Sequence, residues 1–329
     1  MNTQTKIFLK NSLLFTGLVL VIFLLINSLY IHKIEKRKQV YRKEYQWQEF
    51  SNTLPQGTLD YAFFGDSHAD RALNPEFVPN SFNFAGSGES YTETYYKVKK
   101  LIENDNVNIN TIVLEIDLQI FSDKKGLPFS ALRYFSTFVP LSEIADMRGE
   151  NELALYLKKG FIVFGKGNEI ISYLLKQNNE TPVSLGWVKT DGDFSNFTNK
   201  SKSAFESFEA EFSNEPNLIE EDGFNYFLKI LQIAEDNNIN IIFIMYPVSY
   251  EYDLEIQKHF IVREVYYKKL FDLIDDVVTK YDVLDYYKLF FEEPEKFTDA
   301  DHLNYVGAES FSKIVAKDLE KISEKQNKD

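Results

Sequence analysis

Beyond residue 55, short runs of apolar, β-branched and aromatic residues alternate with longer amphipathic segments. The short runs predict strands at residues 59–64, 81–85, 111–117, 241–248 and 283–287. The amphipathic segments predict helices at residues 90–103, 223–236, 253–280 and 305–322. Strands that alternate with helices are typical of a parallel sheet with helices on both faces, so we expect an α/β fold of about five parallel strands.

A long stretch, residues 123–222, separates the third and fourth predicted strands. It contains helical patches and a polar run, and it is too long for an ordinary connection. We interpret it as a partly helical insertion into one α/β domain that covers residues 55–323. Residues 324–329 are a polar tail.

The N-terminus has a different pattern. Residues 11–31 carry no charge and include an almost wholly apolar run, close to the ~20 residues that cross the ~30 Å of hydrocarbon in a bilayer. A cleaved signal peptide is the alternative, but no small-x-small cleavage site follows the run. We therefore predict an uncleaved transmembrane helix at 11–31, with a basic tail at 1–10 and a stalk at 32–54.

Charge gives an ambiguous orientation for this helix. Six Lys and Arg residues lie between residues 33 and 43, after the helix, and positive-inside counting keeps the body in the cytoplasm. Long domains are translocated despite such flanks, so the count alone leaves the orientation open.

The body is strongly acidic. The chain of 329 residues has a net charge of −14, and residues 44–329 hold 28 basic against 49 acidic residues, a net charge of −21. Nucleic acid is an improbable partner, because its phosphates need clustered Lys and Arg. The chain has no cysteine, which excludes disulfides, a thiol nucleophile and a thiolate zinc site.

Candidate chemistry begins where the first predicted strand ends, in Gly65-Asp66-Ser67-His68. A serine on such a turn can be a nucleophile if a histidine removes its proton, whereas the structural alternative is a helix N-cap. Of the four histidines, His32 lies at the membrane edge, His259 lies within a predicted helix, and His68 adjoins the serine and is expected to turn away from it. His302 remains as the candidate base.

His302 follows the last predicted strand, so its loop belongs to the same end of the sheet as Ser67. Asp299, three residues earlier, can orient the imidazole and stabilise its charged form. We interpret Asp301 as a solvated loop or cap residue. A metal site built from Asp299, Asp301 and His302 is the rival interpretation, and no second histidine cluster supports it.

The second predicted strand runs into a glycine-containing turn, residues 85–90. A glycine there lets a backbone amide approach an oxyanion without obstruction. Gly88 is the preferred donor, together with the amide of Ser67.

In this combination the sequence resembles the SGNH (GDSL) hydrolase superfamily. Gly65-Asp66-Ser67 is similar to its first block, residues 83–88 to its second, and residues 299–304 to its last. The resemblance implies a flavodoxin-like fold, a triad of Ser67, His302 and Asp299, oxyanion amides at Ser67 and Gly88, and no cofactor or metal. The third block departs, because Asp117 stands where the family has a conserved oxyanion asparagine, and an anionic side chain there would oppose an oxyanion.

The N-terminal helix and the altered third block are similar to an anchored branch that includes DltD-type proteins of teichoic acid D-alanylation and AlgX- and AlgJ-type alginate O-acetyltransferases. This resemblance implies an extracytoplasmic body and a serine esterase or O-acyltransferase acting on acyl groups of a cell-envelope glycan or surface polymer, beside a membrane-bound O-acyltransferase. A catalytically weak glycan-binding or scaffold protein with the same fold is the alternative. The sequence does not separate hydrolysis from transfer.

Overall fold

The computed structural model describes residues 2–30, 32, 46, 50, 57–103, 107–122, 132–136, 139–161, 183–212, 221–259 and 281–326. The chain divides into two compact units. Helices α1 (Thr3–Tyr30), α5 (Leu132–Phe135), α6 (Leu141–Arg148) and α7 (Glu152–Gly160) belong to the first, and the α/β body forms the second. The predicted insertion, residues 123–222, is therefore divided between the units. Most of the predicted stalk, and residues 260–280 of one predicted helix, lie outside the described residues.

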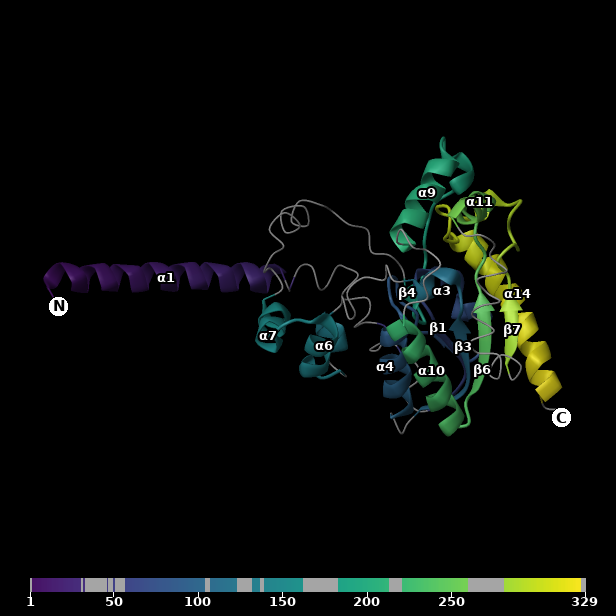
Figure 1. Cartoon of the computed structure of the whole chain (residues 1–329), viewed down its shortest axis with the longest axis horizontal. Coiled ribbons are helices and arrows are strands. Elements are labelled where there is room, and N and C mark those ends of the chain that lie inside the picture. Colours follow the sequence, from purple (N-terminus) through teal and green to yellow (C-terminus); the bar gives the residue numbers. More distant parts are fainter. Residues whose placement is uncertain are drawn as a thin grey trace. The chain divides into compact units, whose positions relative to one another are not determined.

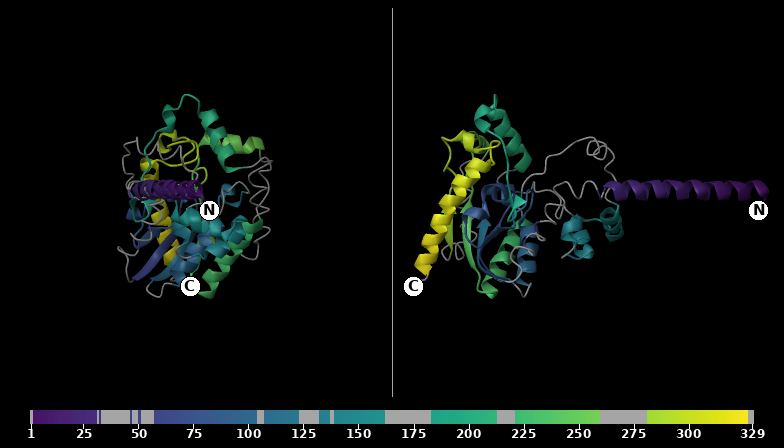
Figure 2. Two further views of the ribbon diagram at one scale, coloured as in Figure 1. Left: turned by 90° about the vertical axis from the view of Figure 1, so that its left-hand side faces the viewer. Right: turned by 180° about the vertical axis from the view of Figure 1, so that it is seen from behind.

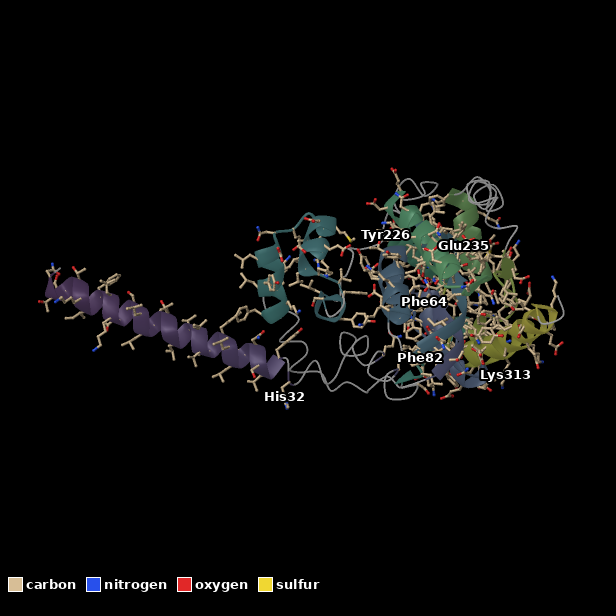
Figure 3. The ribbon with its side chains drawn as sticks, turned by 90° about the horizontal axis from the view of Figure 1, so that it is seen from below. His32, Phe64, Phe82, Tyr226, Glu235 and Lys313 are labelled. Carbon is tan, nitrogen blue, oxygen red and sulfur yellow. The ribbon has the colours of Figure 1, made fainter. Side chains whose placement is uncertain are left out.

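Helix α1 is long and apolar enough to cross a membrane. Its 28 residues extend about 42 Å, compared with ~30 Å of hydrocarbon. Apolar side chains project from all sides of the helix (Figure 3), and only Asn27 and Tyr30 are buried. A surface of this kind is costly in water, so it favours a lipid environment.

The body is built on a five-stranded parallel sheet in the order β2-β1-β3-β6-β7 (Figure 1). Its strands are β1 (Gly57–Phe64), β2 (Ser81–Asn83), β3 (Val107–Glu115), β6 (Asn240–Met245) and β7 (Asp282–Asp285). With the small hairpin of β4 (Val183–Ser184) and β5 (Trp187–Val188) set aside, this is the flavodoxin-like order 2-1-3-4-5. The expected α/β fold is confirmed.

Helices cover both faces of the sheet. On one face α4 (Tyr91–Ile102) packs against α10 (Glu221–Asp236), and on the other α3 (Ser67–Ala72) packs against α14 (Tyr305–Gln326) (Figures 1 and 2). Phe64 and Phe82, labelled in Figure 3, are fully buried members of the hydrophobic core. Because both faces are covered, Phe63 and Phe64 are both fully buried, which explains the continuous apolar run at the end of β1.

The second half of the predicted insertion lies on the body. Strands β4 (Val183–Ser184) and β5 (Trp187–Val188) form a hairpin whose Leu185 carbonyl accepts a hydrogen bond from the Asn83 amide of β2, at 3.0 Å. Helix α9 (Lys200–Glu211) packs against α11 (Tyr250–His259). The Phe194 amide donates to the carbonyl of Phe297 at 2.9 Å. This half of the insertion therefore reaches the loop that carries His302.

Candidate active site

Ser67 begins α3 directly after the carboxyl end of β1. The side chain of Asp66 caps this helix by accepting a hydrogen bond from the His68 amide at 2.9 Å. Asp66, rather than Ser67, therefore acts as the N-cap, and the Ser67 hydroxyl is available for another partner. The turn needs Gly65, because a Cβ there would lie 2.1 Å from Oε2 of Glu115.

The residues of the predicted triad lie together. Oγ of Ser67 is 2.8 Å from Nε2 of His302, and Nδ1 of His302 is 2.9 Å from Oδ1 of Asp299. The same Asp299 oxygen accepts the backbone amide of His302, also at 2.9 Å. Asp299 thereby holds both the ring and the main chain of His302, which leaves Nε2 directed at the serine.

The loop of His302 is fixed at both ends. Phe297 and Leu303 form an isolated antiparallel bridge, and the Thr298 amide donates to the His302 carbonyl at 2.9 Å. Asn304 is buried; its Oδ1 accepts the Gly307 amide at the start of α14 at 3.0 Å, and its Nδ2 donates to the Glu295 carbonyl at 2.7 Å. These bonds hold the short loop rigidly, as a catalytic base requires.

Asp301 differs from the expectation of a solvated loop residue. Its side chain is only 2% exposed, and its Oδ1 accepts a hydrogen bond of 2.6 Å from Ser207 of α9. The same oxygen lies 3.4 Å from Nδ1 of His302. The expectation was wrong because α9, which covers the loop, could not be positioned from sequence. His302 thus faces two carboxylates.

His68 lies behind His302. Its ring stacks on the His302 ring with 4.8 Å between centroids, and its side chain is buried. Its Nδ1 lies 2.9 Å from Nε2 of Gln119. Its Nε2 lies 3.7 Å from Oδ2 of Asp301 and has no hydrogen-bond partner among the described residues. His68 therefore packs against the triad without reaching the serine, as its sequence position led us to expect.

The two carboxylates determine the protonation of His302. Burial disfavours the charged imidazolium, but Asp301 and Asp299 outweigh this effect and raise the pKa of His302 to about 10. Burial also opposes ionisation of Asp301, yet the positive charge of His302 and the Ser207 hydroxyl hold the Asp301 pKa well below its usual range. At neutral pH the site therefore favours the protonated histidine, and the free base increases as the pH rises.

One cation offsets part of this negative charge. Nη1 of Arg71, in α3, lies 3.5 Å from Oδ2 of Asp299. The backbone carbonyl of Arg71 accepts the indole N–H of Trp187 at 2.8 Å, and Trp187 is 8% exposed. This burial and hydrogen bond explain the tryptophan as a packing residue of the hairpin.

The loop between β2 and α4 lies beside the nucleophile helix. The Gly86 amide donates to the Gly65 carbonyl at 3.1 Å, and Ser87 donates to Asp70 of α3 at 2.8 Å. Gly88, two residues beyond Gly86, has a φ of +73° and open space where a Cβ would be. This conformation favours glycine and leaves the backbone of Gly88 sterically accessible.

Two residues of the altered third block have distinct contacts. The Asp117 carboxylate is buried and accepts the Tyr246 amide at 3.0 and 3.2 Å, which joins the ends of β3 and β6. Gln119 reaches His68 and also donates to Glu115 at 2.9 Å. Gln119 therefore connects this block to the histidine pair, a role that the sequence did not reveal.

In the part of the chain that the structure describes, two groups of side chains have ligating atoms within 4.8 Å of one another and could hold a metal ion: His68, Glu211, Asp301 and His302, and Asp66, His68 and Glu115. Hydrogen bonds account for both groups. In the first, Ser207 binds Asp301 and Tyr252 binds Glu211; in the second, Glu115 accepts the Asp66 amide and Asp66 lies 3.1 Å from Nδ1 of His68. The absence of a resident metal stays a prediction of the sequence.

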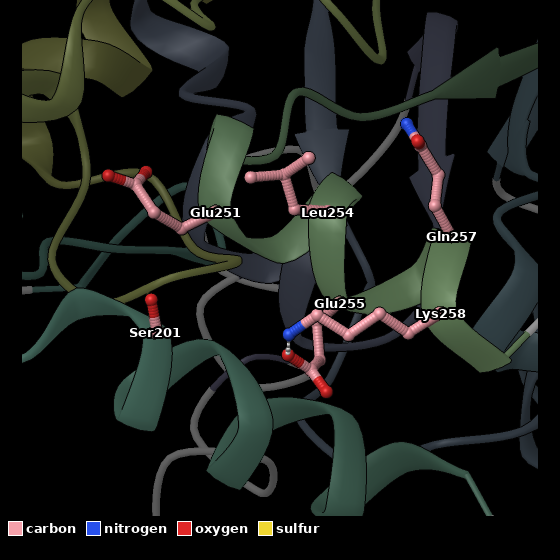
Figure 4. Close-up of a pocket in the computed structure, with 6 residues that line it drawn as sticks. All are labelled: Ser201, Glu251, Leu254, Glu255, Gln257 and Lys258. Carbon is pink, nitrogen blue, oxygen red and sulfur yellow. Dashed lines mark hydrogen bonds and ion pairs between the residues drawn. The ribbon is translucent and has the colours of Figure 1, made fainter.

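A cavity of ≈ 300 Å³ lies between α9 and α11 (Figure 4). It is lined by Ser201, Glu251, Leu254, Glu255, Gln257 and Lys258. Lys258 is paired with Glu255 at 2.5 Å, and the lining contains no histidine. The triad is therefore the better candidate for chemistry.

Comparison with known proteins adds little to this geometry. The chain matches no known protein-family profile and no curated protein sequence. Among solved structures, it is similar to a Bacteroides fragilis protein described as a candidate acylhydrolase, with 9% identity, a TM-score of 0.39, and coverage of 87% of this chain and 99% of that one. A Streptococcus pneumoniae protein described as a candidate platelet activating factor has 12% identity and a TM-score of 0.41, with 91% and 98% covered. Both TM-scores are below 0.5, so these similarities say nothing about the reaction.

Proposed function

We propose that this chain is a membrane-anchored serine esterase or O-acyltransferase of the SGNH type. The observation that carries the proposal is the hydrogen-bonded chain from Ser67 through His302 to Asp299, at 2.8 and 2.9 Å. A serine is inert unless a base is within reach of its proton. This arrangement supplies the orienting carboxylate and, in the molecules whose His302 is neutral, the base; that neutral fraction increases as the pH rises toward about 10.

In the proposed reaction, Oγ of Ser67 attacks the carbonyl carbon of an acyl ester while its proton moves to Nε2 of His302. The backbone amides of Ser67 and Gly88 stabilise the oxyanion of the tetrahedral intermediate. His302 then gives the proton to the departing alcohol, which leaves an acyl-Ser67 ester. Water releases the acyl group as an acid in an esterase, and a sugar hydroxyl accepts it in a transferase.

The anchor supports a substrate near the membrane. We propose that α1 crosses the bilayer, that the body lies outside the cytoplasm, and that the acceptor is a cell-envelope glycan or surface polymer, as in the DltD- and AlgX/AlgJ-type branch. A membrane-bound O-acyltransferase is the proposed supplier of acyl groups. The net charge of −21 in residues 44–329 makes a polyanion an unfavourable substrate unless a local basic surface binds it.

A scaffold role is the second candidate, because Asp117 replaces the family's third-block asparagine and its side chain supplies no oxyanion donor. Cells that produce Ser67→Ala distinguish the two. Loss of polymer acylation with normal levels of membrane-bound protein supports catalysis, whereas unchanged acylation supports a scaffold. Purified full-length protein with p-nitrophenyl acetate, with and without glycan acceptors, then separates hydrolysis from transfer.

A further inference from the structure

Helices α6 and α7 form a compact pair in the same unit as α1. Gly149, with a φ of +59°, ends α6, and α7 begins after the Asn151 cap. Ile144 of α6 and Leu155 of α7 are fully buried. The pair therefore has a small apolar interior that fixes which face of α7 is turned inward.

The opposite face of α7 is apolar and exposed. Leu153, Tyr156 and Leu157 are 67%, 56% and 50% exposed, respectively. Tyr156 and Leu157 follow Leu153 by three and four positions, so the three side chains lie on one side of the helix. In water these three large side chains stay unburied. Complete burial would contribute a free energy of about 1.5–3 kcal/mol for each Leu.

The C-terminal end of α7 contacts α1. The Gly160 carbonyl accepts a hydrogen bond of 3.1 Å from Nδ2 of Asn27, and the ring of Phe161 lies 5.5 Å from the ring of Phe23. Figures 1 and 3 show α7 beside the C-terminal end of α1. Phe23 precedes the last residue of α1, Tyr30, by seven positions, which is about 10 Å along the helix axis.

We propose that α7 is an interfacial helix whose Leu153, Tyr156 and Leu157 side chains insert into the lipid surface next to α1. The contact between Phe161 and Phe23 places the C-terminal end of α7 about 10 Å before the C-terminal end of α1, measured along the α1 axis. This distance agrees with the ~5–10 Å depth to which interfacial helices insert. The exposed face of α7 and the surface of α1 are both apolar, and the two helices are in contact at Asn27 and Gly160, so lipid is the matching occupant. The proposal rests on α1 crossing the bilayer.

The flanking charges suit this position. Lys158 and Lys159 lie in the last turn of α7, and Lys158 is exposed. Long basic side chains extend along apolar surface and keep their ammonium groups at the level of the lipid phosphates, a position open to Lys159, whereas Nζ of Lys158 is paired with Glu150. The six Lys and Arg residues at 33–43 add attraction to anionic lipid.

Spin labelling tests the proposal, because the chain has no cysteine and a single introduced cysteine takes one nitroxide. Full-length Leu153→Cys, Tyr156→Cys and Leu157→Cys are reconstituted in nanodiscs of phosphatidylcholine and phosphatidylglycerol. Lys158→Cys, exposed on another side of α7, is the matched control. Val19→Cys, 49% exposed in the middle of α1, reports separately whether α1 is in the bilayer.

Power saturation compares collisions with oxygen, which concentrates in lipid, and with a water-soluble nickel chelate. The proposal predicts that oxygen dominates at positions 153, 156 and 157 and nickel dominates at 158. If these three positions favour nickel while position 19 favours oxygen, the anchor is correct and the interfacial helix is wrong. If they are shielded from both reagents, a protein covers the face, which also overturns the proposal. A nickel-accessible position 19 refutes the anchor itself.

Discussion

Oγ of Ser67 lies 2.8 Å from Nε2 of His302, although 235 positions separate them in the chain. The parallel sheet creates this contact, because Ser67 follows the carboxyl end of β1 and the His302 loop follows β7, at the same edge of the sheet. The proposed covalent catalysis by Ser67 depends on this distance.

The two carboxylates at His302 predict a graded response to their removal. Neutralising a triad aspartate typically costs about 10⁴-fold in kcat, because the histidine loses its orientation and stabilisation. Here Asp299→Asn alone is expected to cost less, since Asp301 lies 3.4 Å from the same nitrogen. The double variant, Asp299→Asn with Asp301→Asn, is expected to approach the full ~10⁴-fold loss.

Rates of p-nitrophenyl acetate hydrolysis and of fluorophosphonate labelling measure this effect, with the exposed Asp191→Asn as control. A single Asp299→Asn variant as inactive as the double variant would show that Asp301 does not support His302.

The pH dependence follows from the pKa of His302, which is raised to about 10. Ser67 needs the neutral histidine, so the labelling rate is expected to rise with pH up to about 10. Asp301→Asn removes one of the carboxylates that raise this pKa and is expected to shift the profile to lower pH. An unchanged pH profile of labelling in Asp301→Asn would contradict the conclusion that the Asp301 carboxylate raises the pKa of His302.

Stability has the opposite pH dependence. The folded pKa of His302, about 10, lies above the ~6.5 of an unfolded histidine. The histidine's contribution to the free energy of unfolding is therefore complete below about pH 6.5 and is lost as the pH rises toward about 10. Thermal unfolding at pH 6 to 10 is expected to show a smaller decline in His302→Gln than in wild type. Equal declines in thermal stability in the two proteins would show that His302 is not the source of this pH dependence.

Ser207 links the insertion to the triad. Ser207→Ala removes the 2.6 Å hydrogen bond to the buried carboxylate of Asp301 and is expected to destabilise the body by about 1.5–3 kcal/mol. The Asp301 charge then acts more strongly on His302, so the pH profile is expected to move to higher pH. Ser201→Ala, at an exposed position of the same helix, is the control for both readouts. If Ser207→Ala and Ser201→Ala had the same stability and the same pH profile, the contact between α9 and Asp301 would not influence His302.

The Gly65 turn is expected to tolerate no side chain. A Cβ there would also lie 2.7 Å from Cβ of Glu115 and 2.8 Å from Cβ of Ala69, so Gly65→Ala is expected to cost about 1–3 kcal/mol and to displace Ser67. Denaturant unfolding and labelling of the folded fraction measure the two effects. Gly149→Ala, where a Cβ meets nothing within 4 Å, should leave labelling unchanged. A fully labelled Gly65→Ala would show that the turn does not position the serine.

The sheet and the proximity of the principal candidate residues could be predicted because each has a local signal. The strands show as apolar runs, since both faces of the sheet are covered, and Ser67 and His302 lie in short motifs at strand ends. The burial of Asp301 could not be predicted, because it depends on α9, an amphipathic helix with no sequence feature that assigns it to this loop. Gln119 was missed because its contacts with His68 and Glu115 have no signal in the sequence, although its position after β3 pointed to the right edge of the sheet.

Covalent labelling of Ser67 tests the central claim most directly. Full-length protein in nanodiscs is treated with a fluorophosphonate, and the modified peptide is identified by mass spectrometry beside Ser67→Ala and His302→Ala. The account predicts one adduct, on Ser67, that is absent in Ser67→Ala and strongly slowed in His302→Ala. A folded wild-type protein that stays unlabelled, or carries the adduct on another residue, would contradict it.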